Sequence, residues 1–333
     1  MRISVGSLLS SVALSISPVA VASPPAAALS LSYPLQCETR VTCIVQNYLD
    51  IDPGPGVHDY LCGQQTYQGH NGVDFRISDM AAQHRGVAVL AVAPGVVMRT
   101  RDEAPDISMH EADAPSVLGR ECGNGLIVKH RNGWETQYCH MAHGSISVKA
   151  GQAVSRGSPL GLVGLSGMTE FPHLHLTLRH NGIVVDPFGP KLGTGRCSSI
   201  PAASLWDGAA RLRLSYRVGA VLNFGFSNSL VSMPDVEEAK ISPADLRGRF
   251  LIGYVRAIHL RAGDIQVLTI RGPQGVFLAS TTLPALELDK AQSLISVGAR
   301  RPVSGWVQGS YEGSYNVLRR GHVVLAKAFS YLM

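Results

Sequence analysis

Two histidines separated by one residue lie in an apolar stretch near the middle of the chain, where residues 171–178 read FPHLHLTL. Successive side chains of a strand point to opposite faces, so His173 and His175 leave the same side, about 7 Å apart. Two imidazoles in this arrangement suit a shared metal, or one metal ligand and one base. An isolated His-x-His more often represents two hydrogen-bonded histidines in a polar sheet face, so its interpretation depends on further ligands.

Further ligands occur about a hundred residues upstream, where residues 69–75 read GHNGVDF. The even spacing places His70 and Asp74 on one face of an extended segment. Two imidazoles and one carboxylate suit tetrahedral Zn²⁺ with a fourth position open to water, as in catalytic zinc sites. Such zinc lowers the pKa of a bound water towards ~7 and polarises a carbonyl. The chain has no His-Glu-x-x-His motif, so further histidines are the candidates for proton transfer.

The elements that must position these residues are short and rich in valine or leucine, with Pro, Gly or Asn between them, which predicts a mainly β domain. Asn132-Gly133 is typical of a type I′ hairpin turn. An insert between Thr100 and Glu121 is rich in carboxylates and has two open interpretations, a solvated loop or an edge of a substrate groove. The expected strands of this half are residues 72–77, 88–93, 95–99, 125–130, 134–139, 160–164 and 174–179.

A second set of strands follows a segment at 189–208 that has the composition of a linker. Six or more strands over about 120 residues predict a β-sandwich-like domain. This half contains no recognisable catalytic motif, which indicates a packing or binding role. The expected strands are residues 211–224, 250–260, 264–271, 276–278, 305–311 and 322–329.

Composition and the N-terminal segment predict an exported protein. The 333 residues are 45% hydrophobic and 16% charged, with a formal charge of +5 and no Lys/Arg cluster of the kind that binds nucleic acid. Residues 1–22 combine Arg2, an apolar run and a small-x-small cleavage pattern ending at Ala22, which is typical of a signal peptide. The alternative is a retained membrane anchor. The mature chain is expected to be soluble and not inserted in a membrane.

Six cysteines in an exported chain indicate disulfides. Cys122 and Cys139 flank the same predicted hairpin and are the pair that we expect to be bonded. The other pairings stay open, since six cysteines allow 15 connectivities. None of the six forms a Cys-x-x-Cys motif, which disfavours a thiolate zinc site or a redox centre.

The ordered set of motifs resembles the M23 family of zinc peptidases, the lysostaphin- and LytM-like enzymes that cut peptides in peptidoglycan. The resemblance extends over residues 60–190 and rests on the two motifs above, on His140 after Gln137-Tyr138-Cys139, and on the blocks VAPGVV, GNGLIVKH, VKAGQ and the glycines before Pro172. It implies an antiparallel β-sheet peptidase domain with one Zn²⁺, bound by His70, Asp74 and His175. It also implies that His140 and His173 handle the water and the transition-state oxyanion.

The expected protein therefore has five parts: a signal peptide (1–22), an irregular leader (23–59), the peptidase domain (60–190), a linker (191–208) and a sandwich-like accessory domain (209–333). The leading hypothesis is an exported zinc endopeptidase acting on peptidoglycan stem or bridge peptides in the periplasm or outside the cell. One alternative is a non-catalytic M23-like regulator or scaffold of wall hydrolysis. Another makes the C-terminal sandwich a carbohydrate- or protein-binding module supported by the zinc domain.

Overall fold

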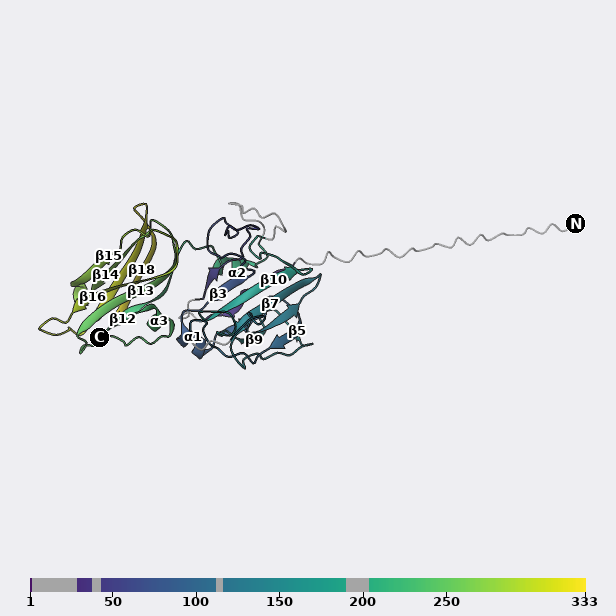
Figure 1. Cartoon of the computed structure of the whole chain (residues 1–333), viewed down its shortest axis with the longest axis horizontal. Coiled ribbons are helices and arrows are strands. Elements are labelled where there is room, and N and C mark those ends of the chain that lie inside the picture. Colours follow the sequence, from purple (N-terminus) through teal and green to yellow (C-terminus); the bar gives the residue numbers. More distant parts are fainter. Residues whose placement is uncertain (2–28, 38–42, 112–115, 190–203) are drawn as a thin grey trace.

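A computed structural model describes residues 1, 29–37, 43–111, 116–189 and 204–333 of the chain. The predicted signal peptide, apart from Met1, therefore lies outside the described residues. Within the described ranges, no helix combines the length and the hydropathy needed to cross a membrane. The chain folds into two β-rich bodies, coloured purple to teal and green to yellow in Figure 1.

The first body is built on a large antiparallel sheet whose order is β2-β3-β10-β7-β6-β5-β8, with β11 paired to the end of β10. The strand β10 lies inside this sheet, where its three leucines face the core while His173 and His175 face the other side. This arrangement confirms the period-two interpretation of the FPHLHLTL segment. The strands are β2 (Ile44–Asn47), β3 (Val73–Arg76), β5 (Gly95–Arg101), β6 (Asn124–Lys129), β7 (Trp134–Met141), β8 (Ala153–Val154), β10 (His173–His180) and β11 (Ile183–Val184).

A second, small sheet packs against the same core and has the order β1-β4-β9. Its strands are β1 (Leu35–Gln36), β4 (Ala88–Leu90) and β9 (Pro159–Leu162). The short helix α1 (Met80–Arg85) precedes β4 and begins at Asp79, whose carboxylate accepts a hydrogen bond from the Ala82 amide. The β6–β7 hairpin turns at Asn132 and Gly133, which both have positive φ, as predicted for a type I′ turn.

The N-terminal leader is more ordered than expected. Its described parts form β1 and β2, and Leu31 and Leu35 are fully buried in the core of the first body. Trp206, expected in the linker, is buried in the same core, and its segment forms an isolated bridge with Leu31. The expectation of an irregular leader at 23–59 was therefore wrong for these residues, because their apolar side chains complete the core.

The second body consists of two antiparallel sheets, β12-β13-β16 and β15-β14-β17-β18. Apolar side chains from both sheets, such as Leu251 and Val255 of β13 and Leu268 of β14, share one core, which confirms the sandwich-like fold. The strands are β12 (Ala220–Ser227), β13 (Phe250–Leu260), β14 (Ile265–Arg271), β15 (Phe277–Thr282), β16 (Lys290–Arg300), β17 (Ser310–Arg319) and β18 (His322–Leu332). The short helices are α2 (Gly208–Arg213), α3 (Met233–Glu237) and η1 (Pro273–Gly275).

Several expected elements of this half were wrong. Residues 211–224 were expected as one strand, but they contain the end of α2 and the start of β12, because Asp207 caps a helix at the Ala210 amide. Residues 305–311 lie mostly in the turn before β17, which starts at Ser310. The strand β16 was missed because its side chains are mostly exposed or half-buried, with Ile295 as its buried apolar residue.

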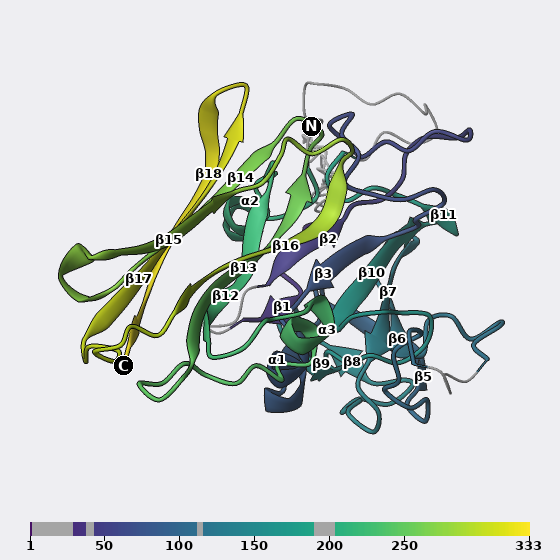
Figure 2. The same ribbon diagram turned by 60° about the vertical axis from the view of Figure 1, so that its left-hand side comes forward.

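The two bodies meet along the edge of the large sheet near β2 and β3, and Figure 2 shows α3 in front of α1 and β3. Ile44 of β2 packs with Leu222 and Ile258 of the sandwich. Beside this apolar contact, the carboxylate of Glu237 from α3 contacts the guanidinium groups of Arg76 and Arg256, both fully buried. The sandwich therefore docks on the strand that also carries Asp74.

Candidate metal and catalytic site

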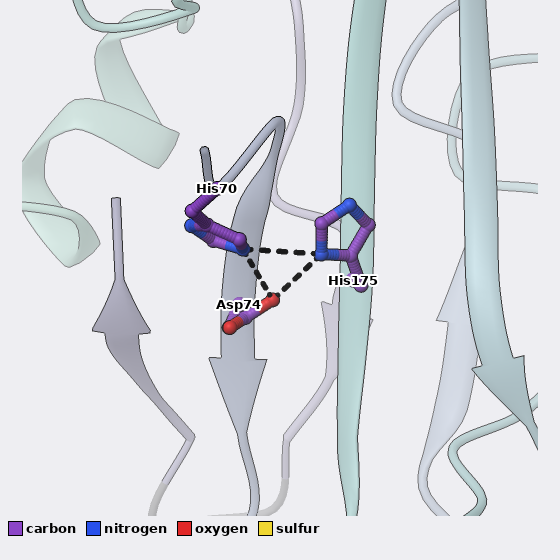
Figure 3. A group of neighbouring side chains, drawn as sticks. All are labelled: His70, Asp74 and His175. Carbon is purple, nitrogen blue, oxygen red and sulfur yellow. Dashed lines mark hydrogen bonds and ion pairs between the residues drawn. The ribbon is translucent and has the colours of Figure 1, made fainter. Parts of the chain in front are cut away.

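The structure brings His70, Asp74 and His175 together at the junction of β3 and β10, as Figure 3 shows. Asp74 lies on β3 and His175 directly opposite it on the antiparallel strand β10. His70 lies in the turn before β3 and its ring points back towards the same spot. All three are almost completely buried.

The ligand atoms of the three residues form a compact triangle. His70 Nε2 lies 3.1 Å from Asp74 Oδ1 and 3.2 Å from His175 Nδ1, and His175 Nδ1 lies 2.9 Å from Asp74 Oδ1. A tetrahedral zinc site with bonds of ~2.0–2.1 Å has edges of ~3.3 Å. A zinc ion would therefore fit the triangle after a shift of a few tenths of an ångström.

Hydrogen bonds on the far side of each ring fix which nitrogen faces the triangle. His70 Nδ1 donates to the Tyr48 carbonyl oxygen at 2.6 Å, and His175 Nε2 donates to Asn71 Oδ1 at 3.1 Å. The remaining nitrogen of each neutral ring is then an acceptor that faces the Asp74 carboxylate. Three acceptors at this separation repel one another unless a cation lies between them, so the donor set fits a metal ion.

Sequence reasoning missed the groups that support these ligands. Asn47 at the end of β2 donates from Nδ2 to Asp74 Oδ2 at 2.8 Å, which leaves Oδ1 directed at the two imidazoles. Gly72 packs so close to His175 that a Cβ at this position would lie 2.5 Å from Nε2. Asn47 lies on β2, which is distant from Asp74 in sequence and carries no motif. The role of Asn47 is therefore visible only in the folded structure.

The electrostatics of the site favour an ionised carboxylate. Burial raises the pKa of Asp74, but the neighbouring imidazoles of His173 and His70 outweigh it and hold this pKa well below its usual value. Burial lowers the pKa of His175. For His70, burial also lowers the pKa, yet the Asp74 carboxylate more than offsets it and the pKa is raised. An anionic oxygen thus faces the rings of His70 and His175, and this arrangement of charge suits a bound cation.

His140 and His173 lie beside the triangle, with ring centroids 4.7 Å apart. His140 Nδ1 donates to the Ser166 carbonyl oxygen at 2.8 Å, and His173 Nδ1 donates to the Phe171 carbonyl oxygen at 2.9 Å. Each ring therefore keeps Nε2 free for chemistry, and His173 Nε2 lies 3.4 Å from Asp74 Oδ1. Burial, together with the charges that His173 and His175 can carry, holds the pKa of His140 well below its usual value, so this ring is neutral near pH 7.

The backbone at His140 adopts φ = 60°, a left-handed conformation that costs energy for a residue with a side chain. It is held by hydrogen bonds of its amide to the Cys122 carbonyl and of its carbonyl to the Gly164 amide, both 2.9 Å. Cys122 is also bonded to Cys139, the residue before His140, which confirms the predicted disulfide. Cys37 and Cys43 form a second disulfide, Cys62 is also disulfide-bonded, and Cys197 lies outside the described residues.

Three other histidines of the first body lie outside the metal triangle. His143, three residues after His140, is exposed. His130, beside the β6–β7 turn, is buried, and its ring bridges the Pro94 carbonyl and the Thr136 hydroxyl, at 2.8 Å each. His180 is half-buried and stacks on Trp134.

A groove of about 290 Å³ opens over the triangle and is lined by both His70 and His175. The insert at 101–121 contributes Glu121 to its wall, next to the disulfide. The insert's Asp106 and Glu111 instead line a separate cleft of about 770 Å³ between the two bodies. The insert does edge the groove, but not with the acidic cluster that made it conspicuous in the sequence.

Comparison with known proteins agrees with this geometry. Residues 68–187 match the sequence model of peptidase family M23. This segment contains all five site residues and most of the large sheet. By this match, residues 68–187 are an M23 peptidase domain.

The match to each curated relative covers only part of that relative's length. An uncharacterized metalloprotease of Haemophilus influenzae is 30% identical over 186 residues, which is 56% of this chain and 32% of that protein. The peptidoglycan DD-endopeptidase ShyA of Vibrio cholerae is 33% identical over 132 residues, 40% of this chain and 25% of ShyA. Among solved structures, the catalytic domain of lysostaphin from Staphylococcus simulans is 23% identical with a TM-score of 0.27, over 42% of this chain and 85% of that domain. The chain thus spans about a third or less of the curated relatives named here.

Proposed function

We propose that this protein is an exported zinc endopeptidase that hydrolyses peptide bonds in peptidoglycan stem peptides or cross-bridges. The observation that carries the proposal is the triangle of His70, Asp74 and His175, in which hydrogen bonds on the far side of each ligand direct three acceptor atoms at one point. This donor set of two imidazoles and one carboxylate is typical of catalytic zinc. The match to the M23 family, whose relatives include ShyA, supports peptidoglycan as the substrate.

When bound, zinc would polarise the scissile carbonyl and make a water molecule more acidic. The open groove would accept an extended peptide. His140, whose low pKa keeps it neutral, is suited to accept a proton. His173, whose Nδ1 is engaged with the Phe171 carbonyl, would donate a hydrogen bond from Nε2 to the oxyanion of the transition state in its imidazolium form.

Export and the domain bounds belong to the same proposal. The signal-like sequence at 1–22 and the disulfides between cysteines suit an oxidising compartment outside the cytoplasm. We also propose the bounds of three segments: a peptidase domain at 60–190, a linker at 191–208 and an accessory domain at 209–333. The buried Leu31 and Trp206 indicate that flanking residues complete its core.

The test is a paired assay on residues 23–333, in which bound zinc is measured and digestion of purified peptidoglycan is followed by mass spectrometry. We expect one zinc per chain and new peptide termini. His173→Ala should keep the zinc and lose at least ~10²-fold in rate, as loss of acid–base assistance usually does. His143→Ala is the matched control, since this exposed histidine lies outside the triangle, and it should keep both zinc and activity.

Three results would contradict the proposal in different ways. Absence of zinc would refute the metal site. Zinc without cleavage would favour the regulator or scaffold hypothesis. Full activity in the His173→Ala variant would refute the role given to that residue.

A further inference from the structure

The groove at the metal triangle continues along the sheet into a second depression of about 390 Å³. The two share Glu121, Cys122 and Gln137 as lining residues, so they form one continuous furrow. The second depression lies over β5 and β6, on the side of β7 that faces away from β10. A peptide bound at the triangle would be led along this furrow.

The register of the strands shows that the furrow follows one face of the sheet. Thr177 on β10 pairs with Gln137 on β7, Gln137 pairs with Ile127 on β6, and Ile127 pairs with Arg99 on β5. All four residues line the furrow, and Thr177 shares the face of His175 because the two are two residues apart on one strand. A straight row of side chains therefore leads from the metal site to Arg99.

The far part of the furrow is basic. Arg99, Arg101 and Arg120 line the second depression, Arg179 lines the first, and the charge that opposes them among the described lining residues is Glu121. Four positive charges against one negative leave a net charge of +3 along the furrow. The insert at 101–121, which looked acidic in the sequence, supplies two of these arginines.

Two of these guanidinium groups, those of Arg99 and Arg120, are exposed and available to bind a ligand. Arg99 is exposed, and within the described part of the chain it forms no ion pair. Arg120 has Glu103 at 3.8 Å, but both side chains are about two-thirds exposed, and such pairs are weak. Burial lowers the pKa of Arg179, the carboxylate of Glu135 offsets part of this effect, and the positive charge of Arg99 lowers the pKa further. An anion in the furrow would relieve this repulsion.

We propose that the furrow between the metal triangle and Arg99 is a subsite for a carboxylate of the substrate peptide, with Arg99 and Arg120 as its specificity-determining residues. This inference rests on the proposed peptidase function, because it takes the ligand to be an extended peptide that crosses the sheet. Arginine is suited to the role because its planar fork binds a carboxylate through two parallel hydrogen bonds.

The geometry also limits where the carboxylate lies in the substrate. Three strand spacings of ~4.8 Å separate β10 from β5, or ~14 Å in all. An extended peptide advances ~3.3 Å per residue, and an arginine side chain reaches part of the way back. The carboxylate should therefore belong to a residue about two to four positions from the scissile bond.

The experiment uses two synthetic peptidoglycan stem-peptide dimers that differ at one position, two to four residues from the bond identified by mass spectrometry. One carries a carboxylate there and the other a carboxamide. Dissociation constants are measured on the zinc-loaded His173→Ala protein, which keeps the peptides intact, and cleavage is measured separately on the wild type. We expect the carboxylate peptide to bind about 5- to 30-fold more tightly, as two exposed arginines at up to ~1 kcal/mol each would give.

When Arg99→Gln and Arg120→Gln are both introduced into the His173→Ala protein, the ratio of the two dissociation constants should come close to one. Arg131→Gln removes one positive charge from the exposed β6–β7 turn outside the furrow and should keep the ratio, whereas Arg99→Gln or Arg120→Gln alone should lower it. Equal binding of both peptides, or a preference that survives the double substitution, would overturn the subsite. A preserved preference in a wild-type protein that cleaves neither peptide would support the subsite and refute the peptidase function instead.

Discussion

Replacing Glu237 by glutamine should strongly destabilise the protein, because one carboxylate neutralises two buried arginines. Its Oε2 atom accepts hydrogen bonds from Arg76 of the peptidase domain and Arg256 of the sandwich. Both arginines are fully buried, and the Glu237 side chain is 18% exposed. Burial lowers the pKa of Arg76 to about 10 even with Glu237 beside it, so the guanidinium pays a desolvation penalty that the carboxylate only partly offsets.

The magnitude follows from what remains after the substitution. Glutamine keeps a similar shape but removes the negative charge. Asp79 stays near enough to influence Arg76, while Gln46 and Asn223 offer neutral hydrogen bonds to the two arginines. Breaking a buried pair by removing one partner typically costs 3–5 kcal/mol. We expect the free energy of unfolding to fall by about 3–5 kcal/mol. The two bodies should dock more weakly, and each should be less stable.

The assay is urea unfolding followed by tryptophan fluorescence. Trp134 and Trp206 report on the first body and Trp306 on the sandwich, so separate transitions can be recognised. Glu238→Gln is the matched control, since that neighbouring carboxylate pairs with a largely exposed Lys240 and should contribute less than ~1 kcal/mol. Equal stabilities of the Glu237→Gln and Glu238→Gln variants would refute the reasoning, because the buried charges would then not depend on the carboxylate.

Two further predictions concern single buried residues. Burial, with a contribution from the charge of Asp59, raises the pKa of Asp186 from 3.8 to about 7, so the stability provided by its protonated form is complete below pH 4 and is lost as the pH rises through 7. Asp186→Asn should remove this pH dependence, which is worth up to ~4 kcal/mol in the free energy of unfolding. In urea unfolding at pH 5 and pH 8, the wild type should lose stability between the two pH values relative to Asp186→Asn. An equal change in both proteins would contradict the raised pKa. Asn47→Ala removes the donor to Asp74 Oδ2 and should weaken zinc binding about 10- to 100-fold in a chelator competition, whereas unchanged affinity would show that the carboxylate orients without it.

Much of the candidate site could be predicted from the sequence, because its residues sit in locally readable patterns. The alternation of histidine and leucine in β10 places the two histidines on one face, and the core requires the leucines on the other. Asn132-Gly133 predicts the hairpin that brings Cys122 and Cys139 together. In each case the information lies within a few residues of the feature.

The features that could not be predicted depend on contacts between distant segments. Arg211 and Leu212 begin an alternation typical of a strand, yet Asp207 caps a helix there, and the buried Ala210 and Leu214 lie four residues apart on its inner face. The neutralisation of Arg76 by Glu237 joins residues 161 positions apart. Neither local propensity nor a motif indicates such a pairing.

The support that Asn47 and Tyr48 give to the ligands has a consequence for how the catalytic unit is delimited. Both residues precede the segment that matches the family, which begins at residue 68. The unit recognisable by homology is therefore smaller than the unit that can work. A fragment cut at that boundary would carry every signature residue, but His70 would lose its acceptor and Asp74 its donor. Such a fragment would contain all five site residues but lack two of the groups that orient its metal ligands.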